Sequence, residues 1–409
     1  MTDPCATTSL TVVEALEHIG AAIRPIRGYR RVALREALGH VLADTIVADQ
    51  PVPAHDHSAM DGYAVRSEDR RIECLRCIGS VFAGQPFTAT LAPGECVRIM
   101  TGGVIPAGAD AVIMQEQTES EGDTVTLRRW PDQGDNIRRA GDDLQAGDTV
   151  LPAGRRITSA DLGLMASLGQ AEVEIVRPLR VAFFSTGDEL RGVGEILAAG
   201  EIYDSNRYSL YGMLSSLQVD LMDMGVVPDD PTAVQDALTG AAAQADVVIT
   251  SGGVSVGEAD FVGQIVRDQG EAHFWSLAMK PGRPLTFGRF ADAWFFGLPG
   301  NPVSVMATFT QVVTPALRQL AGETLRPRPR FRLPCRSNLS KKPGRQDFQR
   351  ARLVISEDGS LAVESVGRQG SGMLRSMSAA DCFIVLAADS GDVTAGDWVT
   401  VEPFGKPLI

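Results

Sequence analysis

The feature that most constrains this chain is an alternation of apolar runs and helical segments between residues 180 and 320. Short buried-strand patterns cover residues 180–184, 219–227, 246–250 and 294–298, and polar loops and helical segments follow them. Strands that alternate with helices at this spacing predict a doubly wound, mainly parallel α/β sheet. Ligands of such sheets bind outside the carboxyl ends of the strands, where the polar loops of this segment gather.

The segments on either side of this region have a different pattern. Between about residues 46 and 150, short apolar runs alternate with turn signals such as Ala92-Pro93-Gly94 and Glu121-Gly122-Asp123, which predicts a β-rich domain. The segment after Pro327 repeats this pattern and predicts a small β-barrel. Helices are expected at residues 8–23, with Thr11 or Ser9 as the cap, around residues 34–42 and at residues 159–168. A chain of 409 residues is too long for one ordinary core, so several domains are expected.

Composition and charge exclude several classes of function. A net charge of −13 argues against general nucleic-acid binding, which needs a basic face. A small anion can still bind to a few local cations and backbone amides, and an acidic enzyme that handles phosphates is expected to recruit a divalent metal. No apolar run reaches the roughly 18 residues of a membrane span, and the first residues lack a signal-peptide pattern. We therefore expect a cytoplasmic protein.

The six cysteines do not form a recognisable framework. They are scattered over the chain, and Cys74 and Cys77 form a single CxxC pair. A structural zinc site needs about four ligands, and no second pair lies at a suitable distance. A redox pair would open a helix after a strand, whereas this pair lies within an apparent β segment. Buried thiols are the expected outcome.

Three polar loops at predicted strand ends could carry chemistry. The first contains Ser251, Gly252 and Gly253, where glycines would let backbone amides approach an anion, although a tight structural turn is the alternative. The second is residues 185–189, whose hydroxyls and carboxylates could hold a phosphate, a metal or a pterin amine, unless Asp188 simply caps a helix. The third, residues 280–284, holds two cations on a Pro-stiffened turn, with a solvated charged turn as the alternative.

A fourth candidate lies in the predicted β-rich domain. Asp61 precedes Gly62 in a run of small residues, which suits a metal–phosphate site or a plain turn. His55 and His57 precede this run, but two histidines without a third ligand make a weak metal site.

Nine segments together resemble the molybdopterin molybdenumtransferase family, which includes the E domain of gephyrin. They occur in the family's order over nearly the whole chain, which makes the resemblance specific. Their sequences are PVPAHDHSAMDGYAVR (51–66), RIMTGGVIPAGADAVIMQE (98–116), NIRRAGDD (136–143), STGDEL (185–190), YDSN (203–206), TSGGVSVGEADF (250–261), MKPGRPLTFG (279–288), GLPGNPVS (297–304) and RQGSGML (368–374).

The resemblance implies an elongated homodimer of multidomain subunits. An N-terminal helix (1–26) is expected to pack with the α/β molybdopterin-binding domain (178–326), which is similar to molybdopterin-adenylylating proteins. The resemblance also implies a small mixed linking domain (27–45 and 146–177), a β-rich domain (46–145) and a C-terminal β-barrel (327–409). In this family the site lies where the second subunit's Asp61 and Thr101 regions approach the α/β domain.

The implied reaction is the insertion of molybdate into adenylylated molybdopterin with release of AMP, assisted by Mg²⁺. The resemblance implies catalytic roles for Asp61, Thr101, Glu189, Asp229 (or its neighbour Asp230) and Asp260, with Asp61, Glu189 and Asp260 as metal ligands. The substrate-binding residues implied are Asp143, Ser185, Thr186, Ser251, Gly252, Gly253, Lys280, Arg283, Pro299, Asn301, Arg345 and Ser371. Two departures from the family's pattern stand out. Arg283 stands where the family often has Lys, and Asp347 stands where it usually has Glu.

Two other functions remain open at this point. One is adenylylation of molybdopterin, the preceding step, and the other is a non-catalytic molybdopterin-binding scaffold. The predicted β-rich domain and barrel favour insertion, because the adenylylating proteins lack them. The resemblance also implies contact with the molybdopterin-adenylylating protein and with molybdoenzyme maturation factors, and no nucleic-acid or membrane partner.

Overall fold

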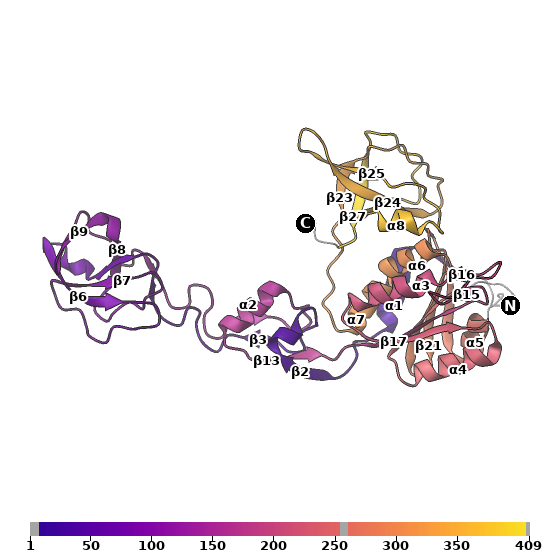
Figure 1. Ribbon diagram of the computed structural model, residues 1–409, viewed down its shortest axis with the longest axis horizontal. Helices are drawn as coiled ribbons and strands as arrows, with labels where there is room; N and C mark the ends of the chain where they lie inside the picture. The colour runs from indigo at the N-terminus through magenta and orange to yellow at the C-terminus, as the bar shows by residue number, and fades with distance from the viewer. Residues whose placement is uncertain (1–7, 254–260, 406–409) are drawn as a thin grey trace. The chain divides into compact units, whose positions relative to one another are not determined.

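The computed structural model describes residues 8–253 and 261–405 of the chain. Its contacts divide the chain into two compact units (Figure 1). Unit 1 comprises residues 1–30, 39–41 and 175–409, and unit 2 comprises residues 31–38 and 42–174. Each unit is described separately below.

Unit 1 contains a seven-stranded sheet with the strand order β1-β19-β21-β22-β18-β14-β17. The pairs β14–β17, β14–β18, β18–β22 and β1–β19 are parallel, which confirms the expected mainly parallel sheet. The antiparallel pairs β19–β21 and β21–β22 were not predicted from the sequence. The strands are β1 (Thr8–Leu10), β14 (Arg180–Thr186), β17 (Asp220–Val227), β18 (Val247–Ser251), β19 (Glu271–Leu277), β21 (Pro284–Phe290) and β22 (Ala293–Leu298).

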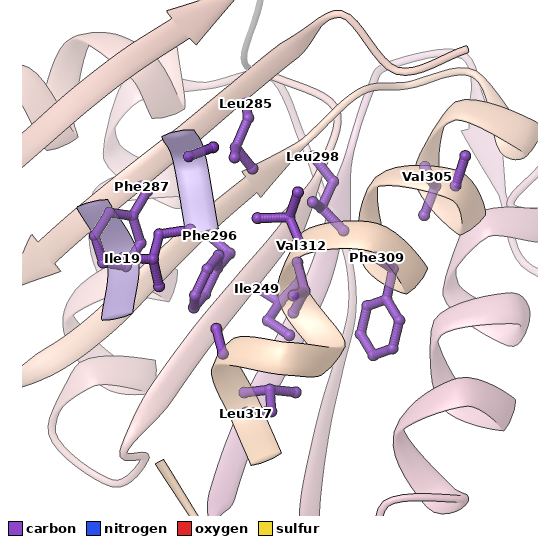
Figure 2. Packing of buried hydrophobic residues seen from close by; sticks show 14 of the residues in the cluster. Ile19, Ile249, Leu285, Phe287, Phe296, Leu298, Val305, Phe309, Val312 and Leu317 are labelled. Carbon is purple, nitrogen blue, oxygen red and sulfur yellow. The ribbon is translucent and has the colours of Figure 1, made fainter. Parts of the chain in front are cut away.

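Helices cover both faces of this sheet because its central strands are apolar on both sides. Along β14, Val181 and Phe183 belong to one buried cluster, while Ala182 and Phe184 belong to the other. The first cluster includes Ile19 of the N-terminal helix; Figure 2 shows it from close by. Its helices are α1 (Val12–Ala22), α3 (Ser205–Ser215), α6 (Pro302–Thr308), a π-helical turn (Phe309–Val313) and α7 (Thr314–Leu320), whereas α4 (Pro231–Ala242) and α5 (Phe261–Gln269) belong to the second cluster.

The helix starts follow local capping chemistry. Thr11, one of two candidate caps, begins α1 through a capping box: its hydroxyl accepts from Glu14 N (3.2 Å), and Glu14 Oε2 accepts from Thr11 N (2.8 Å). The helix expected around residues 34–42 is wrong. That segment contains only a 3₁₀ turn, Leu34–Ala37, which follows β2 (Tyr29–Ala33). Leu42 N donates to Arg155 O (2.9 Å), so pairing with a distant segment replaces the helical hydrogen bond that Leu42 would make to Leu38 O.

Unit 2 contains a six-stranded sheet with the order β8-β5-β7-β6-β10-β9, and strand pairs β3–β12 and β4–β11. The helix predicted at residues 159–168 is present as α2 (Ser159–Ser167), which Thr158 caps. The strands are β3 (Ile46–Val47), β4 (His57–Ser58), β5 (Gly62–Val65), β6 (Cys74–Val81), β7 (Glu95–Ile99), β8 (Ala111–Met114), β9 (Thr118–Glu121), β10 (Thr124–Leu127), β11 (Ile137–Arg138) and β12 (Thr149–Leu151), with 3₁₀ turns at Ser67–Asp69 and Gln115–Gln117; β13 (Glu172–Val176) pairs with β2.

The C-terminal segment of unit 1 forms a separate sheet with the order β20-β24-β26-β27-β23, and β25 also pairs with β24. An isolated bridge between Cys335 and Val363 links the chain just after β23 to β25. The elements are β20 (Met279–Lys280), β23 (Phe331–Pro334), β24 (Gln346–Ile355), β25 (Leu361–Ser365), α8 (Leu374–Ser378), β26 (Cys382–Leu386) and β27 (Trp398–Pro403). Because β20 comes from the α/β segment, this sheet is joined directly to the loop that carries Lys280.

A buried ion cluster also fastens the C-terminal sheet to the α/β segment. Glu402 is 1% exposed and accepts hydrogen bonds from Gln311 (2.6 Å), Arg328 (3.0 Å) and Arg330 (2.8 Å). These three donors hold the pKa of Glu402 below its ordinary value despite its burial. The arrangement satisfies a carboxylate that would otherwise be costly to bury.

The structure shows which cysteines are buried and whether any helix could span a membrane. Cys74 is exposed and Cys77 half-buried, so the expectation of buried thiols is wrong for Cys74, whereas Cys96, Cys335 and Cys382 are buried. Burial raises the pKa of Cys96 and of Cys382 to about 12, which keeps both as thiols. Among the helices of the described residues, none has both the length and the apolar character of a membrane span.

Candidate active site

The polar loops of the α/β sheet meet at the carboxyl ends of its central strands. The neighbouring strands β14 and β18 end at Thr186 and Ser251, and the helices that follow them, α3 and α5, belong to opposite core clusters. This is the switch point at which doubly wound sheets bind ligands. Two adjoining cavities lie there, and Gly252, Gly253 and Gly300 line both of them.

The first cavity, which we call the acidic cavity, has a volume of about 220 Å³. Its acidic lining residues are Glu189, Asp204 and Asp229, and no Lys or Arg of the described residues lines it. Six of the predicted site residues are brought together here: Thr186, Glu189, Asp229, Ser251, Gly252 and Gly253.

The carboxylate of Asp229 has an unfavourable electrostatic environment. Burial and the negative charges of Asp188 and Glu189 raise the pKa of Asp229 above its ordinary value. A bound cation would relieve both effects, and carboxylate oxygens are the ligands that Mg²⁺ uses. Glu189 and Asp229 therefore suit a divalent cation at this cavity.

The structure distinguishes the neighbouring acids that the sequence left ambiguous. Asp230 caps α4, because its Oδ1 accepts from Thr232 N (3.1 Å) and Ala233 N (2.9 Å). Asp229 instead lines the acidic cavity. Asp188 caps no helix: a short strand, β15 (Leu190–Arg191), follows it and pairs with β16 (Ile202–Tyr203), and Asp188 Oδ1 accepts from Asp229 N (3.1 Å).

The second cavity, which we call the cationic cavity, has a volume of about 580 Å³. Lys280, Arg283 and Arg345 line it, and none of its described lining residues is acidic. The predicted residues Pro299, Asn301 and Ser371 line it as well. Such a cavity, with three cations next to glycine-rich backbone, can bind oxyanions such as phosphate or molybdate.

Contacts with the C-terminal sheet hold this cationic cavity in place. Lys280 Nζ lies 3.3 Å from Asp347 Oδ2, and Asp347 is buried on β24. The loop carrying Ser371 is joined to α6, because Val303 N donates to Ser371 O (2.9 Å). Asp347 thus anchors one of the site's cations.

The shared loop requires glycine for a steric reason. Gly252 has a φ of 92°, and a Cβ atom there would lie 2.7 Å from Thr186 O. Both a side chain and the required backbone conformation are therefore unfavourable for any other residue. The glycine brings the ends of β14 and β18 close enough to form one site.

Comparison with known proteins identifies the family. Three family models match the chain: the MoeA N-terminal region (domain I and II) at residues 10–169, the probable molybdopterin binding domain at 182–319 and the MoeA C-terminal region (domain IV) at 332–404. A molybdopterin molybdenumtransferase of Haemophilus influenzae is 46% identical over 378 residues, which covers 92% of this chain and 94% of that protein. The chain belongs to the molybdopterin molybdenumtransferase family.

Other relatives agree with this assignment. Molybdopterin molybdenumtransferase 2 of Mycobacterium tuberculosis is 36% identical over 392 residues, covering 93% of this chain and 95% of that protein. The crystal structure of the molybdopterin biosynthesis moeA protein of Pyrococcus horikoshii OT3 is 29% identical, with a TM-score of 0.83. It covers 97% of this chain and all of that chain, so the family fold extends over the whole molecule.

Three predicted site residues lie in unit 2. Asp61 Oδ1 accepts hydrogen bonds from Thr101 N (2.7 Å) and Thr101 Oγ1 (2.8 Å), so the structure places these two residues together. The two hydrogen bonds lower the pKa of Asp61, which keeps it ionised. Asp143 is exposed, and its backbone N donates to Val52 O (3.0 Å).

The remaining predicted residues lie outside the two cavities or the described chain. Ser185 is 1% exposed at the end of β14 and lines neither cavity. Asp260 lies outside the described residues. Within residues 8–253 and 261–405, no three His, Cys, Asp or Glu side chains are grouped to hold a metal, and His55 and His57 lie with ring centroids 6.5 Å apart.

Sequence reasoning missed four polar residues of the acidic cavity, Tyr203, Asp204, Ser205 and Asn206. None of them was among the predicted site residues. The signal was present in the segment YDSN (203–206), which served only as support for the family resemblance. Asp204 and Asn206 belong to the first turn of α3, and they also face the cavity.

Proposed function

We propose that this chain inserts molybdate into adenylylated molybdopterin and releases AMP. Its membership of the molybdopterin molybdenumtransferase family supports this reaction. The observation that carries the proposal is the pair of adjoining cavities of opposite charge that share the Gly252–Gly253 loop. A substrate with a phosphoanhydride between two ring systems needs both the cationic and the acidic cavity.

The cationic cavity would bind the anionic groups of the reaction. Molybdate and the phosphoanhydride repel each other, and Lys280, Arg283 and Arg345 would offset that repulsion. Lys280 would exchange part of its interaction with Asp347 for the ligand. No nucleophilic Ser or Cys is needed in this scheme, because the two dithiolene sulfurs would replace two molybdate oxygens directly. These oxygens would leave as two waters after taking up protons, and cleavage of the phosphoanhydride to AMP would consume one water.

The acidic cavity would hold a divalent cation, proposed as Mg²⁺, through Glu189 and Asp229, with Asp260 as the third expected ligand. Such an ion would neutralise the charge that develops on the phosphate as AMP leaves. The raised pKa of Asp229 supports this role, since an ionised carboxylate among other carboxylates is stabilised by a cation.

We also propose that the active enzyme is a homodimer in which Asp61 and Thr101 of the second subunit complete the reaction site. The Asp61–Thr101 pair supports this, because its carboxylate is kept ionised without any basic partner within hydrogen-bond distance among the described residues. Mixing Asp61→Ala and Glu189→Ala proteins should restore part of the activity through hybrid dimers. Subunit exchange shown by mass without any return of activity would contradict a shared site.

Finer points of organisation are also proposals. The domain boundaries at residues 27, 46, 146, 178 and 327 rest on sequence patterns and on the family resemblance. We propose that the C-terminal sheet closes into a barrel, because the Cys335–Val363 bridge links its two ends. A cytoplasmic location, and contacts with the molybdopterin-adenylylating protein and with molybdoenzyme maturation factors, stay predictions of the sequence.

The test is to incubate the protein with adenylylated molybdopterin, molybdate and Mg²⁺, and to measure AMP by chromatography. The proposal expects AMP release that depends on molybdate. The closest rival, adenylylation of molybdopterin, would instead consume ATP and form the adenylylated compound. ATP consumption with molybdopterin, and no molybdate-dependent AMP release, would replace the proposed function by that rival.

A further inference from the structure

Three buried oxygen atoms at the acidic cavity have no hydrogen-bond partner among the described residues. They are Asp204 Oδ2, Asn206 Oδ1 and Thr186 Oγ1. Their residues are 1%, 9% and 5% exposed, and all three line the acidic cavity. An unsatisfied buried polar group costs about 1–3 kcal/mol, so three at one cavity indicate a place for a ligand.

The orientation of Asn206 is fixed by its other interactions. Its Nδ2 donates to Ser251 Oγ (2.9 Å) and to Gly300 O (2.7 Å). A carbonyl oxygen such as Gly300 O only accepts, so the amide nitrogen must face it. The amide oxygen is therefore the atom left free, and it can only accept a hydrogen bond.

Asp204 is held with one oxygen used and one available. Its Oδ1 accepts from Arg207 N (3.1 Å) at the start of α3. Its Oδ2 lies 3.5 Å from Arg207 Nε without hydrogen-bond geometry, and the guanidinium of Arg207 donates instead to Asp223 Oδ1 (3.1 Å) and Oδ2 (3.2 Å). Oδ2 thus keeps its capacity to accept from a ligand.

We propose that the acidic cavity binds the amino-bearing edge of the pterin ring, with Asp204 and Asn206 as its hydrogen-bond acceptors. This inference rests on the proposed function and assigns one end of its substrate. A 2-amino-4-oxopteridine presents an exocyclic amino group and a ring N–H on one edge, which supplies the donors that two neighbouring acceptors require. A phosphate brings only acceptors and negative charge, so Asp204 Oδ2 and Asn206 Oδ1 cannot pair with it.

Size and position agree with this assignment. The cavity of about 220 Å³ is smaller than the roughly 300–1,000 Å³ of sites that enclose a whole drug-sized ligand. It suits one fused ring, and the remainder of the substrate must leave it. Because Gly252 and Gly253 line both cavities, the phosphates can pass over this loop to Lys280 and Arg345.

Binding of two pteridines to the full-length protein tests the proposal. The probes are pterin and its 2-oxo counterpart, lumazine, in which the amino group is replaced by an acceptor, and the measurement is ligand fluorescence in an equilibrium titration. We expect lumazine to bind at least tenfold more weakly than pterin, because acceptor would face acceptor. Equal binding of the two probes, or no binding of pterin at millimolar concentration, would overturn the proposal.

Asp204→Asn is the matching variant. Asn caps a helix about as well as Asp, so α3 should form, while the carboxylate acceptor is lost. We expect pterin affinity to fall about tenfold, with AMP affinity unchanged. The control is Asp230→Asn, the same exchange at the cap of α4, which should leave pterin affinity unchanged.

The outcomes separate this inference from the proposed function. If Asp204→Asn weakens AMP binding and leaves pterin binding intact, the adenine amino group occupies the cavity and the pterin assignment is wrong. If neither affinity changes while the parent protein still releases AMP with molybdate, the acceptors serve no ligand and only this inference fails. Absence of molybdate-dependent AMP release from the parent protein would instead remove the proposed function.

Discussion

Two aspartates at opposite ends of the same α/β sheet have pKa values shifted in opposite directions. Asp246, just before β18, accepts from Arg177 Nη1 (2.7 Å) and Nη2 (2.9 Å) and from Arg180 N (2.9 Å). These bonds outweigh its burial and lower its pKa to about 2. Asp229, just after β17, has acidic neighbours instead, and its pKa is raised.

The difference separates structural charge from functional charge. At the amino ends of the strands, the carboxylate of Asp246 is satisfied by two arginines and holds segments together. At the carboxyl ends, hydroxyls, an amide oxygen and one carboxylate oxygen lack hydrogen-bond partners among the described residues, so this end is arranged for a ligand rather than for stability. Perturbed groups of this second kind mark functional sites more reliably than charge alone.

The largest effect is expected from Asp229→Asn. Loss of the carboxylate should reduce molybdate-dependent AMP release between about 10²- and 10³-fold, as the removal of one electrostatic contact in a reaction site does. The folded protein should lose no stability, because the carboxylate is unfavourable there; calorimetry checks this. Activity within twofold of the parent enzyme would place Asp229 outside the site. Asp230→Asn, at the cap of α4, is the matched control.

Asp246→Ala should have the opposite effects: the protein should lose stability and keep its activity. This substitution removes a paired, largely buried carboxylate and leaves the arginines that contact it without their acceptor. It should lower the free energy of unfolding by about 2–4 kcal/mol, measured by urea denaturation. The rate per folded molecule should stay within about twofold of the parent rate. Asp292→Ala, a fully exposed position with an ion-pair distance of 3.7 Å to Arg289, should cost under about 0.5 kcal/mol. An equal cost at both positions would remove the proposed structural role.

Lowering the pH should remove the stability that Asp246 contributes. The folded pKa of Asp246, about 2, is below its ordinary 3.8, so its stabilising contribution is present above about pH 4 and is lost as pH falls from 4 toward 2. Allowing for screening by water, this loss is about 1–2 kcal/mol. Melting curves of the parent protein and of Asp246→Asn should therefore converge over that pH range. Curves that stay parallel from pH 5 to pH 2 would contradict the lowered pKa.

A smaller effect is expected from Lys280→Ala. The variant should need about tenfold more molybdate for half-maximal AMP release, or should bind the adenylylated substrate about tenfold more weakly, equivalent to ~1.4 kcal/mol. It also leaves Asp347 without its ion pair, so Asp347→Asn is needed alongside to separate the two effects. Arg336→Ala, which removes a cation outside both cavities, should change neither quantity. An unchanged molybdate dependence would make Lys280 a solvated surface lysine.

Much of the α/β domain could be predicted, because its strands are apolar on both faces and their loops carry glycine. The segments around Thr186, Ser251 and Leu298 were placed at strand ends from such local patterns, and the structure brings them together. The antiparallel strands β19 and β21 were missed. Their pattern, with Thr286 buried beside apolar residues, depends on neighbours far away in the sequence.

The part of the site that could not be predicted depends on tertiary contacts. Asp204 and Asp230 are both helix caps, and only packing against the ends of β14 and β18 makes the first one a cavity residue. Likewise, the pairing of Asp347 with Lys280 joins residues 67 positions apart. The short helix expected around residues 34–42 failed for the same reason, since Leu42 N donates to the distant Arg155 O instead of to a helical carbonyl.

Hydrogen–deuterium exchange of the full-length protein, with and without adenylylated molybdopterin, tests most directly the claim that the carboxyl end of the sheet is the reaction site. The account predicts ligand protection of backbone amides in residues 186–189, 203–206, 251–253 and 298–304. Residues 177–180 and 245–247, around Asp246, should exchange at unchanged rates. Protection confined to the amino end of the sheet, or to unit 2 alone, would contradict the account.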